Sequence, residues 1–519
     1  MGYLIGFTTF RTSHNGNLAL AGSVSAGLVL LYLTHCILAA IYQLFFSPLR
    51  HIKGPRLWIA FPVFQHITFL RGNLDSTLLR LHQHYGHAVR IGPNEISFNN
   101  AKAWDDIYGH GKNLPKASFF DAPKGLPEHL ISANSADHTR YRKAMSNGFS
   151  ESSIRLQEPL IKVHSDLFLA RLRDLAISNQ RIDMVKWLHL VTFDLIGDLA
   201  FGQSFGCLES SDEGGFVRNM FYFIKAGAWL RVASSYPLLK WLFRITTPKH
   251  LIEAHNAQLE LAKNTTTKRM NNADQQGRGD FLDAMVKKRN QPGGLNDLEI
   301  IVNANILISA GAETSATTMA GTLFWLLKNP KVMAKVQHEV RTTFKSQDEI
   351  NFITSTSKLP FMISCITEAM RRFPPLPITL PRKTPENQRT VVSGHELPPN
   401  VIVGVNQYSA YLDARNFHRP EEYIPERWDA AAYKDPKSEF HLDRREVLQP
   451  FSVGPRNCIG RNLAYCETRT LLALLFYNFD MELCPESANW HHQKTWFWSQ
   501  HVAQYLQSGN GVRNGCHCR

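Results

Sequence analysis

The chain has no closely spaced cysteine framework, which excludes the class of small secreted domains held together by disulfides. Its eight cysteines are spread over 519 residues: Cys36, Cys207, Cys365, Cys458, Cys466, Cys484, Cys516 and Cys518. This spacing favours a reducing compartment that faces the cytosol. Cys516 and Cys518 form a close pair, but their position at the very end indicates a frayed tail more than a metal site.

The sequence also lacks a fixed-period repeat and any nucleic-acid-binding motif. Lys and Arg number 57 against 44 Asp and Glu, which gives a formal net charge of +13. The basic residues are scattered, so we expect no nucleic-acid partner. An anionic lipid surface or an acidic protein fits this charge better. With 44% hydrophobic residues the chain can bury a large core, and most of it is not disordered.

Charge is missing altogether from residues 18–46, which contain no Asp, Glu, Lys or Arg. A run of roughly 29 such residues is long enough to cross a bilayer with some tilt. A cleaved signal peptide would have a shorter apolar core and a small-residue cleavage site. The sequence therefore predicts a retained anchor at 18–46, after a short lumenal tail at 1–17 and before a catalytic domain at 47–519. Basic residues follow the span, which predicts that this domain lies on the cytosolic side: Arg50, His51, Lys53 and Arg56.

Helical periodicity dominates after residue 47, with short strand-like runs near 88–98 and 398–406. A long apolar helix is predicted from Leu298 to Leu327. Asn296 and Glu299 form a capping-box pattern at its start, and Asn329-Pro330 ends it. We expect a mainly α-helical fold with small β-sheets, crossed by this helix.

The most specific motif is Phe451-Ser-Val-Gly454-Pro-Arg456-Asn-Cys458-Ile-Gly460. It resembles the haem-binding signature of the cytochrome P450 family, F-x-x-G-x-R-x-C-x-G, at every defined position. A thiolate ligand donates electron density to haem iron and favours cleavage of the oxygen–oxygen bond. The glycines let the backbone turn and approach a porphyrin closely. The alternative is a buried structural cysteine in a glycine-containing loop.

The resemblance implies that Cys458 is the axial ligand of haem b, that Phe451 shields it, and that Arg456 pairs with a haem propionate. His138-Thr-Arg140-Tyr-Arg142 is similar to the family's W-x-x-x-R segment, with His in place of Trp. His138 and Arg142 share a helix face, so both can reach a propionate. Arg382 is a further propionate candidate by the same resemblance.

Two other segments are similar to family motifs. Glu368-Ala-Met-Arg371 matches E-x-x-R, and Pro425-Glu-Arg427-Trp428 resembles P-E-R-F with Trp in place of Phe. The resemblance implies that Glu368, Arg371 and Arg427 form a buried structural network that fixes the cysteine loop. Taken alone, a Glu–Arg pair at this spacing is usually a solvated surface contact.

Ala310-Gly311-Ala312-Glu313-Thr314 is similar to the oxygen-activation segment of the family's long central helix. The resemblance implies catalytic roles for Thr314, whose hydroxyl directs a proton to oxygen, and for Glu313, which relays protons from solvent. Gly311 is expected to remove bulk where the helix passes over the haem. The alternative is a capped surface turn in a threonine-rich helix.

By fold analogy the substrate pocket is apolar and draws on several segments of the chain. Its expected lining is Phe119, Phe120, Phe221, Phe223, Trp229, Ile308, Leu376, Ile378 and Leu380, with Asn305 or Ser309 as polar contacts. The alternative is that these residues simply fill the core. The chain departs from the family after Trp498, where a proline and an apolar strand are usual, so the last strands are in doubt.

The overall likeness is to fungal secondary-metabolite hydroxylases. It implies a monooxygenase of the endoplasmic reticulum membrane that oxidises a lipophilic terpenoid, polyketide or alkaloid. Electrons would come from NADPH through cytochrome P450 reductase, with cytochrome b5 as a possible second donor. The expected reductase surface is basic: Arg140, Lys143, Arg444, Arg445, Arg456 and Arg461. Two alternatives stay open, a dioxygen-independent haem-thiolate isomerase or dehydratase and a haem-binding sensor that catalyses nothing.

Overall fold

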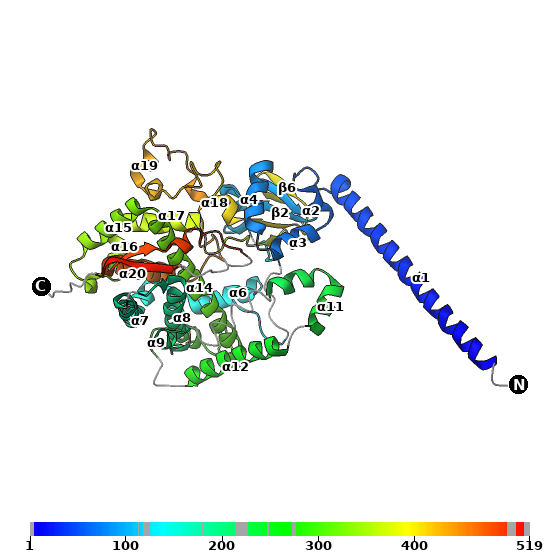
Figure 1. Cartoon of the computed structure of the whole chain (residues 1–519), viewed down its shortest axis with the longest axis horizontal. Coiled ribbons are helices and arrows are strands. Elements are labelled where there is room, and N and C mark those ends of the chain that lie inside the picture. Colours follow the sequence, from blue (N-terminus) through cyan, green and yellow to red (C-terminus); the bar gives the residue numbers. More distant parts are fainter. Residues whose placement is uncertain are drawn as a thin grey trace.

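The computed structural model describes residues 5–112, 114–117, 125–178, 180–212, 227–246, 249–271, 277–495 and 505–512. A helical body carries small, separate sheets, one near the base of a long projecting helix and one beside α20 (Arg461–Asn478) at the far end (Figure 1). The predicted mainly α-helical fold with small β-sheets is confirmed.

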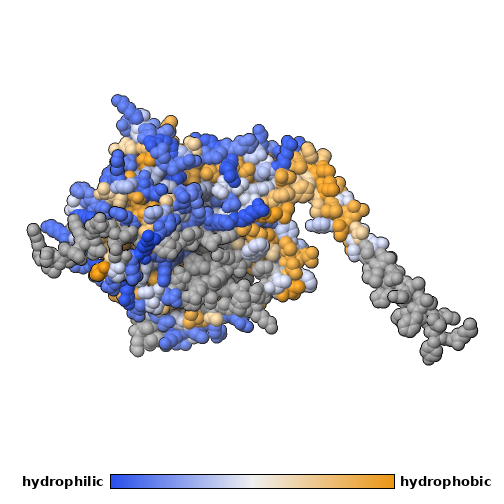
Figure 2. Space-filling model, viewed as in Figure 1, coloured by the Kyte–Doolittle hydropathy of each residue, from blue (hydrophilic) through white to orange (hydrophobic). Residues whose placement is uncertain are grey.

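The projecting helix is α1 (Ile5–Ile41), which continues as a short π-helical turn from Tyr42 to Phe46. Its segment Ser23–Phe46 spans 24 residues with a mean hydropathy of 2.1, so it is long and apolar enough to cross a membrane. Figure 2 shows hydrophobic residues along this segment and continuing onto the adjoining surface of the body. Packing against α2 (Arg56–Ala60) fixes the base of the segment.

The first half of the body is built from short and medium helices around two long ones. These helices are α3 (Val63–Leu70), α4 (Leu74–Tyr85), α5 (Ala101–Tyr108), α6 (Ser135–Met145), α7 (Glu151–Ile177), α8 (Met184–Phe201), α9 (Cys207–Ser210), α11 (Pro237–Thr246), α12 (Lys249–Asn271) and α13 (Phe281–Val286). The second half contains α14 (Asp297–Lys328), α15 (Pro330–Thr343), α16 (Phe352–Ser357), α17 (Pro360–Arg372), α18 (Gln407–Tyr411), α19 (Ala430–Lys434) and α20 (Arg461–Asn478).

The sheets are small, and they join segments far apart in the sequence. The strands are β1 (Ala88–Gly92), β2 (Glu95–Phe98), β3 (Ile182–Asp183), β4 (Arg382–Lys383), β5 (Thr390–Val392), β6 (His395–Leu397), β7 (Ile402–Val405), β8 (Phe479–Leu483) and β9 (Tyr505–Val512). One sheet has the order β1-β2-β7-β4, with β2 and β7 parallel, so both predicted strand regions are confirmed. A second has the order β3-β9-β8, so the chain does form a strand after its departure from the family pattern.

Helix α14 crosses the body, and its start is fixed by the predicted capping box. The Asn296 side chain accepts from the Glu299 amide, while the Glu299 carboxylate accepts from the Asn296 amide. Its C-terminus lies before Asn329, where Pro330 begins α15. Helices α8, α17 and α20 pack around α14, so most side chains in its second half are buried.

Gly311 lies where α14 packs closely against α8. A Cβ at this position would lie 2.7 Å from Cδ1 of Ile196 on α8. The glycine therefore allows α14 to approach α8 closely, because any side chain would collide with that neighbouring helix.

Candidate functional site

The Cys458 side chain lies in the loop before α20 and is exposed in the structure. The Cys458 amide donates to the Phe451 carbonyl at 2.9 Å, which closes the loop. Gly454 has φ = +75°, and a Cβ there would lie 1.8 Å from the Tyr108 carbonyl oxygen, so only glycine fits. Burial raises the pKa of the Cys458 thiol, while the Gly460 amide and Arg142 act in the opposite direction. The Gly460 amide and Arg142 thus favour the thiolate form of Cys458, while burial opposes it.

Two further features shape the loop. The Phe451 ring packs edge-on against Tyr465, with centroids 5.0 Å apart. A Cβ at Gly460 would lie 4.0 Å from the Cys458 sulfur, which leaves one side of the thiol open.

A group of basic side chains lies beside this loop. They come from the segment after α5, from α6, from β4 and from the loop itself: Lys116, His138, Arg142, Arg382 and Arg456. Burial and the neighbouring cations, Arg456 first among them, lower the pKa of His138 to about 3. Burial and Arg382 lower the pKa of Lys116 to about 7, and burial followed by Arg382 lowers that of Arg456 to about 10.

Most of these cations bond to neutral partners. Arg142 donates to the Asn457 carbonyl at 2.6 Å, Arg456 donates to the Ala133 carbonyl at 2.9 Å, and Lys116 donates to the Ile131 carbonyl. A buried cationic cluster bonded to neutral carbonyl oxygens favours an anion, since each cation would regain its ordinary pKa beside one. A planar group with two carboxylates and a metal that binds thiolate, as in haem, fits this set of residues.

Sequence reasoning missed Lys116 and Tyr108 in this cluster. Lys116 lies opposite Arg382 in an isolated antiparallel bridge, a long-range pairing with no local signal. The Tyr108 hydroxyl donates to the Leu380 carbonyl at 2.7 Å, and the Arg382 guanidinium lies 5.3 Å from its ring centre. Tyr108 thereby contacts the Arg382 side chain through its ring and the backbone at Gly454 through its carbonyl oxygen.

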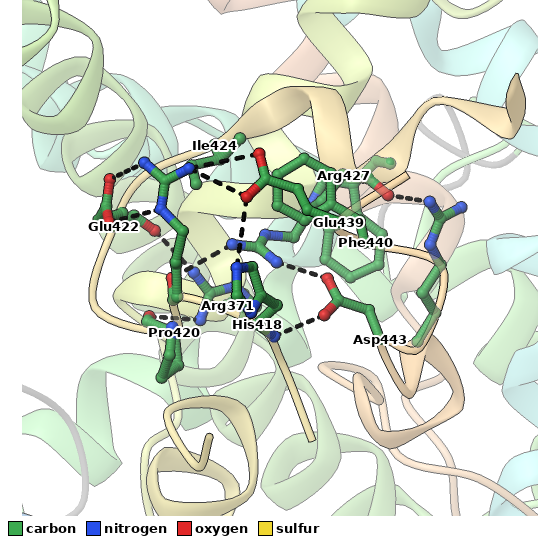
Figure 3. A network of polar contacts seen from close by, with 12 residues as sticks. Arg371, His418, Pro420, Glu422, Ile424, Arg427, Glu439, Phe440 and Asp443 are labelled. Carbon is green, nitrogen blue, oxygen red and sulfur yellow. Dashed lines mark hydrogen bonds and ion pairs between the residues drawn. The ribbon is translucent and has the colours of Figure 1, made fainter. Parts of the chain in front are cut away.

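Glu368, Arg371 and Arg427 are fully buried and belong to one polar network. Figure 3 shows Arg371 and Arg427 in this network, together with Asp443. Arg371 donates to Glu368 at 2.7 and 2.9 Å, and Arg427 donates to the same carboxylate at 3.1 Å and also to Asp443. Two carboxylates balance two guanidinium groups, which offsets the cost of burying four charges. Burial alone would raise the pKa of Glu368, but Arg371 and Arg427 hold it below its ordinary value.

This network extends to the cysteine loop and explains the tryptophan that replaces the family's phenylalanine. The Trp428 indole donates to Glu368 at 2.9 Å, a bond that Phe cannot make. Arg371 donates to the Tyr411 carbonyl at 2.8 Å, and the Tyr411 hydroxyl accepts from the Gln449 amide at 3.1 Å. Gln449 precedes Phe451 by two residues, so bonded groups run from α17 to the start of the loop.

The middle of α14 directs its polar side chains to different sides. The Thr314 hydroxyl is half-buried and donates to the Ala310 carbonyl at 2.8 Å. Glu313 is only 1% exposed, and its carboxylate lies 2.9 Å from Nε2 of His189 on α8. The carboxylate therefore has no direct contact with bulk water, a feature that the sequence did not reveal.

The expected pocket residues are only partly brought together. Ile308 is fully buried in the main core, while Asn305, Ile306, Ser309 and Ala310 are the partly exposed residues on that stretch of α14. Ile308 thus lies on the core side of the helix, and its place in a substrate pocket stays a prediction.

The other expected pocket residues divide between two clusters and the surface. Leu376 and Ile378 pack with Ala228 and Val232, whereas Leu380 packs against a second cluster that includes Tyr108. Trp229 is 57% exposed and points outward, which is not the position of an inward-facing lid. Phe119, Phe120, Phe221 and Phe223 lie outside the described residues.

Of the basic residues expected at a reductase surface, Lys143, Arg444 and Arg461 are exposed. Arg140 is bound to Glu299 at 2.6 Å, and Arg456 and Arg445 donate to backbone carbonyls. Basic side chains that are already bound within the protein attract an acidic partner less strongly. The prediction of a basic reductase surface therefore depends on Lys143, Arg444 and Arg461.

Comparison with known proteins gives a consistent result. The sequence profile described as Cytochrome P450 matches residues 53–506. The chain is 45% identical to trichothecene C-4 hydroxylase of Trichoderma arundinaceum over 480 residues, covering 92% of this chain and 96% of that protein. It is 43% identical to cytochrome P450 monooxygenase olcB of Penicillium canescens, with 90% and 96% coverage, and 36% identical to averantin hydroxylase of Dothistroma septosporum, with 85% and 82%. The chain therefore belongs to the cytochrome P450 family of haem-thiolate monooxygenases.

Proposed function

We propose that this protein hydroxylates a lipophilic terpenoid of fungal secondary metabolism, using NADPH-derived electrons and dioxygen. The observation that carries the proposal is the exposed Cys458 side chain beside Lys116, Arg142 and Arg456, three basic side chains that donate to backbone carbonyl oxygens. Similarity to a trichothecene hydroxylase over almost the full length of both chains favours a terpenoid over the polyketide and alkaloid alternatives.

Each group in the site has a separate task in this proposal. The bound haem supplies the activation of dioxygen and the insertion of one oxygen atom into a carbon–hydrogen bond. Cys458 binds the iron through its thiolate, and Lys116, His138, Arg142, Arg382 and Arg456 hold the propionates. The Glu368 network fixes the loop, while the Thr314 hydroxyl and the Glu313 carboxylate hold and move protons above the site.

Two alternative functions remain, and Thr314 argues against both of them. An isomerase or dehydratase needs no protons delivered to dioxygen, and a sensor needs none either. Glu313 and Thr314 supply adjacent proton-carrying groups on the helix nearest the expected chamber. Consumption of NADPH with purified reductase and substrate would separate the monooxygenase from both alternatives.

The membrane arrangement follows from the apolar surface near α1. We assign residues 1–17 to the lumenal side, 18–46 to the bilayer and 47–519 to a cytosolic catalytic domain at the endoplasmic reticulum. Large apolar side chains are exposed on α2, α3 and the segment from α11 back to residue 229: Leu57, Phe61, Val63, Phe64, Ile67, Trp229, Leu230, Leu238, Leu239, Trp241, Leu242 and Ile245. An exposed apolar patch next to an anchor favours contact with lipid, from which a lipophilic substrate can be drawn.

Replacement of the ligand tests the haem assignment. In Cys458→Ser the alcohol is a poor donor to iron, so the reduced carbon monoxide complex should lose the strongly red-shifted Soret band of a thiolate-ligated haem. The Cys466→Ser variant, altered at a buried cysteine of α20, serves as the matched control and should keep the band. A wild-type spectrum from Cys458→Ser would end the assignment.

Binding experiments test the substrate class. A trichothecene that lacks the C-4 hydroxyl group is the first probe, followed by a panel of polyketides, alkaloids and small charged compounds. Lipophilic terpenoids should shift the haem spin state and yield a product one oxygen atom heavier. Spin-state shifts with the charged compounds alone would contradict an apolar pocket.

A further inference from the structure

A buried histidine–carboxylate pair joins α8 to α14 immediately beside Thr314. Nε2 of His189 lies 2.9 Å from Oε2 of Glu313, and the two side chains are 3% and 1% exposed. The residues are 124 positions apart in the chain, so the pair exists only because the two helices pack together. The close approach that Gly311 allows against Ile196 holds the helices at this separation.

The hydrogen bonds of His189 determine where a proton must lie. Nδ1 of His189 lies 2.8 Å from the Val185 carbonyl oxygen, which can only accept, so Nδ1 carries a hydrogen. Nε2 and the Glu313 carboxylate then need one further proton between them to form their bond. This proton belongs either to an imidazolium facing a carboxylate or to a carboxylic acid facing a neutral ring. In both forms the pair holds one exchangeable proton.

Thr314 is the next residue along α14, and its own hydroxyl is bonded to Ala310. Successive side chains on a helix point about 100° apart, so Glu313 faces His189 while Thr314 faces another side. Glu313 must therefore change rotamer before it can serve Thr314. The strength of the bond between Glu313 and His189 determines how often the Glu313 side chain changes rotamer. It also determines whether the Glu313 carboxyl group carries a proton when it does.

We propose that His189 is a positioning residue for proton delivery, which holds Glu313 away from Thr314 and keeps a transferable proton on the pair. The inference rests on the proposed function of Glu313 and Thr314. In the transfer, the rotated Glu313 carboxyl group gives one proton to the Thr314 hydroxyl, which passes its own proton on. The carboxylate then regains a proton from water on the partly exposed Thr314 side of the helix before it returns to His189. No electron moves and no covalent bond to carbon changes.

A second histidine–carboxylate pair in the same protein provides a matched control. Nε2 of His164 on α7 lies 3.1 Å from Oδ2 of Asp198, and the histidine is also buried. Asp198 lies on α8 and has an additional partner in Arg278 at 2.6 Å, so this pair joins α7 to α8. Loss of His164 should therefore affect packing without affecting proton delivery.

The test compares His189→Leu, His189→Gln, Glu313→Gln and His164→Leu in the full-length holoenzyme with reductase. The substrate is the trichothecene probe, or the panel compound that gives the largest spin-state shift. Gln at 189 can still donate to Glu313, so it preserves folding, but it cannot carry a transferable proton. We expect both His189 variants to lose about tenfold or more in product per NADPH, with KM unchanged and peroxide release raised. His164→Leu should lose stability but keep the wild-type yield.

A spectroscopic measurement separates this role from a structural one without turnover. The infrared difference between each protein and its Glu313→Gln counterpart isolates the Glu313 carboxyl band in the resting enzyme. His189→Leu should shift this band, because the Glu313 carboxyl group loses its bond to the imidazole and burial favours its neutral form. An unchanged band would overturn the proposal.

The outcomes also distinguish the proposed function of Glu313 from the positioning role of His189. If Glu313→Gln keeps the wild-type product yield, the proposed function of Glu313 fails and this inference fails with it. If Glu313→Gln loses the yield while His189→Gln keeps it, only the inference fails. The apolar double variant His189→Leu/Glu313→Leu should recover stability, because both polar partners are gone, but not the yield. Recovery of the yield would show that the pair is structural.

Discussion

Glu467 on α20 is expected to make the stability of this protein fall as pH rises through the neutral range. Its side chain is 1% exposed, and neither carboxyl oxygen has a hydrogen-bond partner of standard geometry among the described residues. Burial raises its pKa from 4.5 to about 8, with a small opposing effect from the Ser315 hydroxyl on α14. At neutral pH the folded protein therefore holds Glu467 as a neutral acid, while the unfolded chain ionises it.

The magnitude follows from proton linkage. The folded state binds one proton more than the unfolded state between pH 4.5 and about 8, so the free energy of unfolding falls with rising pH across this window. At about 1.36 kcal/mol for each pH unit, the wild type loses roughly 5 kcal/mol from this group over the window. Its contribution is complete below pH 4.5 and is lost by about pH 8. Glu467→Gln is neutral throughout and should not show this loss.

Denaturant unfolding of the detergent-solubilised holoenzyme at several pH values between 5 and 8 provides the assay. The stability of Glu467→Gln relative to the wild type should rise steadily with pH, by several kcal/mol in total. Glu482→Gln, which changes an exposed carboxylate on β8, is the matched control and should leave the pH dependence as it is. Parallel pH curves for Glu467→Gln and the wild type would refute the reasoning.

Three further predictions follow from the site. Thr314→Ala should retain haem and substrate binding but release about tenfold more peroxide per product, because the hydroxyl that directs a proton to oxygen is gone. An unchanged product yield per NADPH would make Thr314 structural. Arg427→Met removes the cation bonded to the buried Asp443 and should cost about 3–5 kcal/mol and most of the bound haem. Arg419→Met at an exposed pair should cost less than about 1 kcal/mol, and equal losses in thermal unfolding would contradict the network. Electron transfer from reductase should slow as salt rises above about 0.15 M, where the Debye length is ~8 Å, and Arg461→Glu should slow it at low salt; a salt-independent rate would indicate an apolar docking surface.

The sequence by itself determined the features that depend on neighbouring residues. Asn296 and Glu299 gave the start of α14 because a capping box involves only the first turn of a helix. Residues 18–46 indicated an apolar span because length and charge are enough to recognise one. The loop from Phe451 to Cys458 was recognisable because its turn demands glycine at fixed positions.

Only the tertiary structure decided which side chains meet across the body. His189 reaches Glu313, and Lys116 reaches Arg382, because separate helices and strands pack side by side. Periodicity gives the face on which a residue lies but not the neighbour that this face meets, so the packing of Ile308 in the main core came from the tertiary structure alone. Partners so distant along the chain leave no local pattern, since their contact is stabilised by burial of the surrounding apolar side chains.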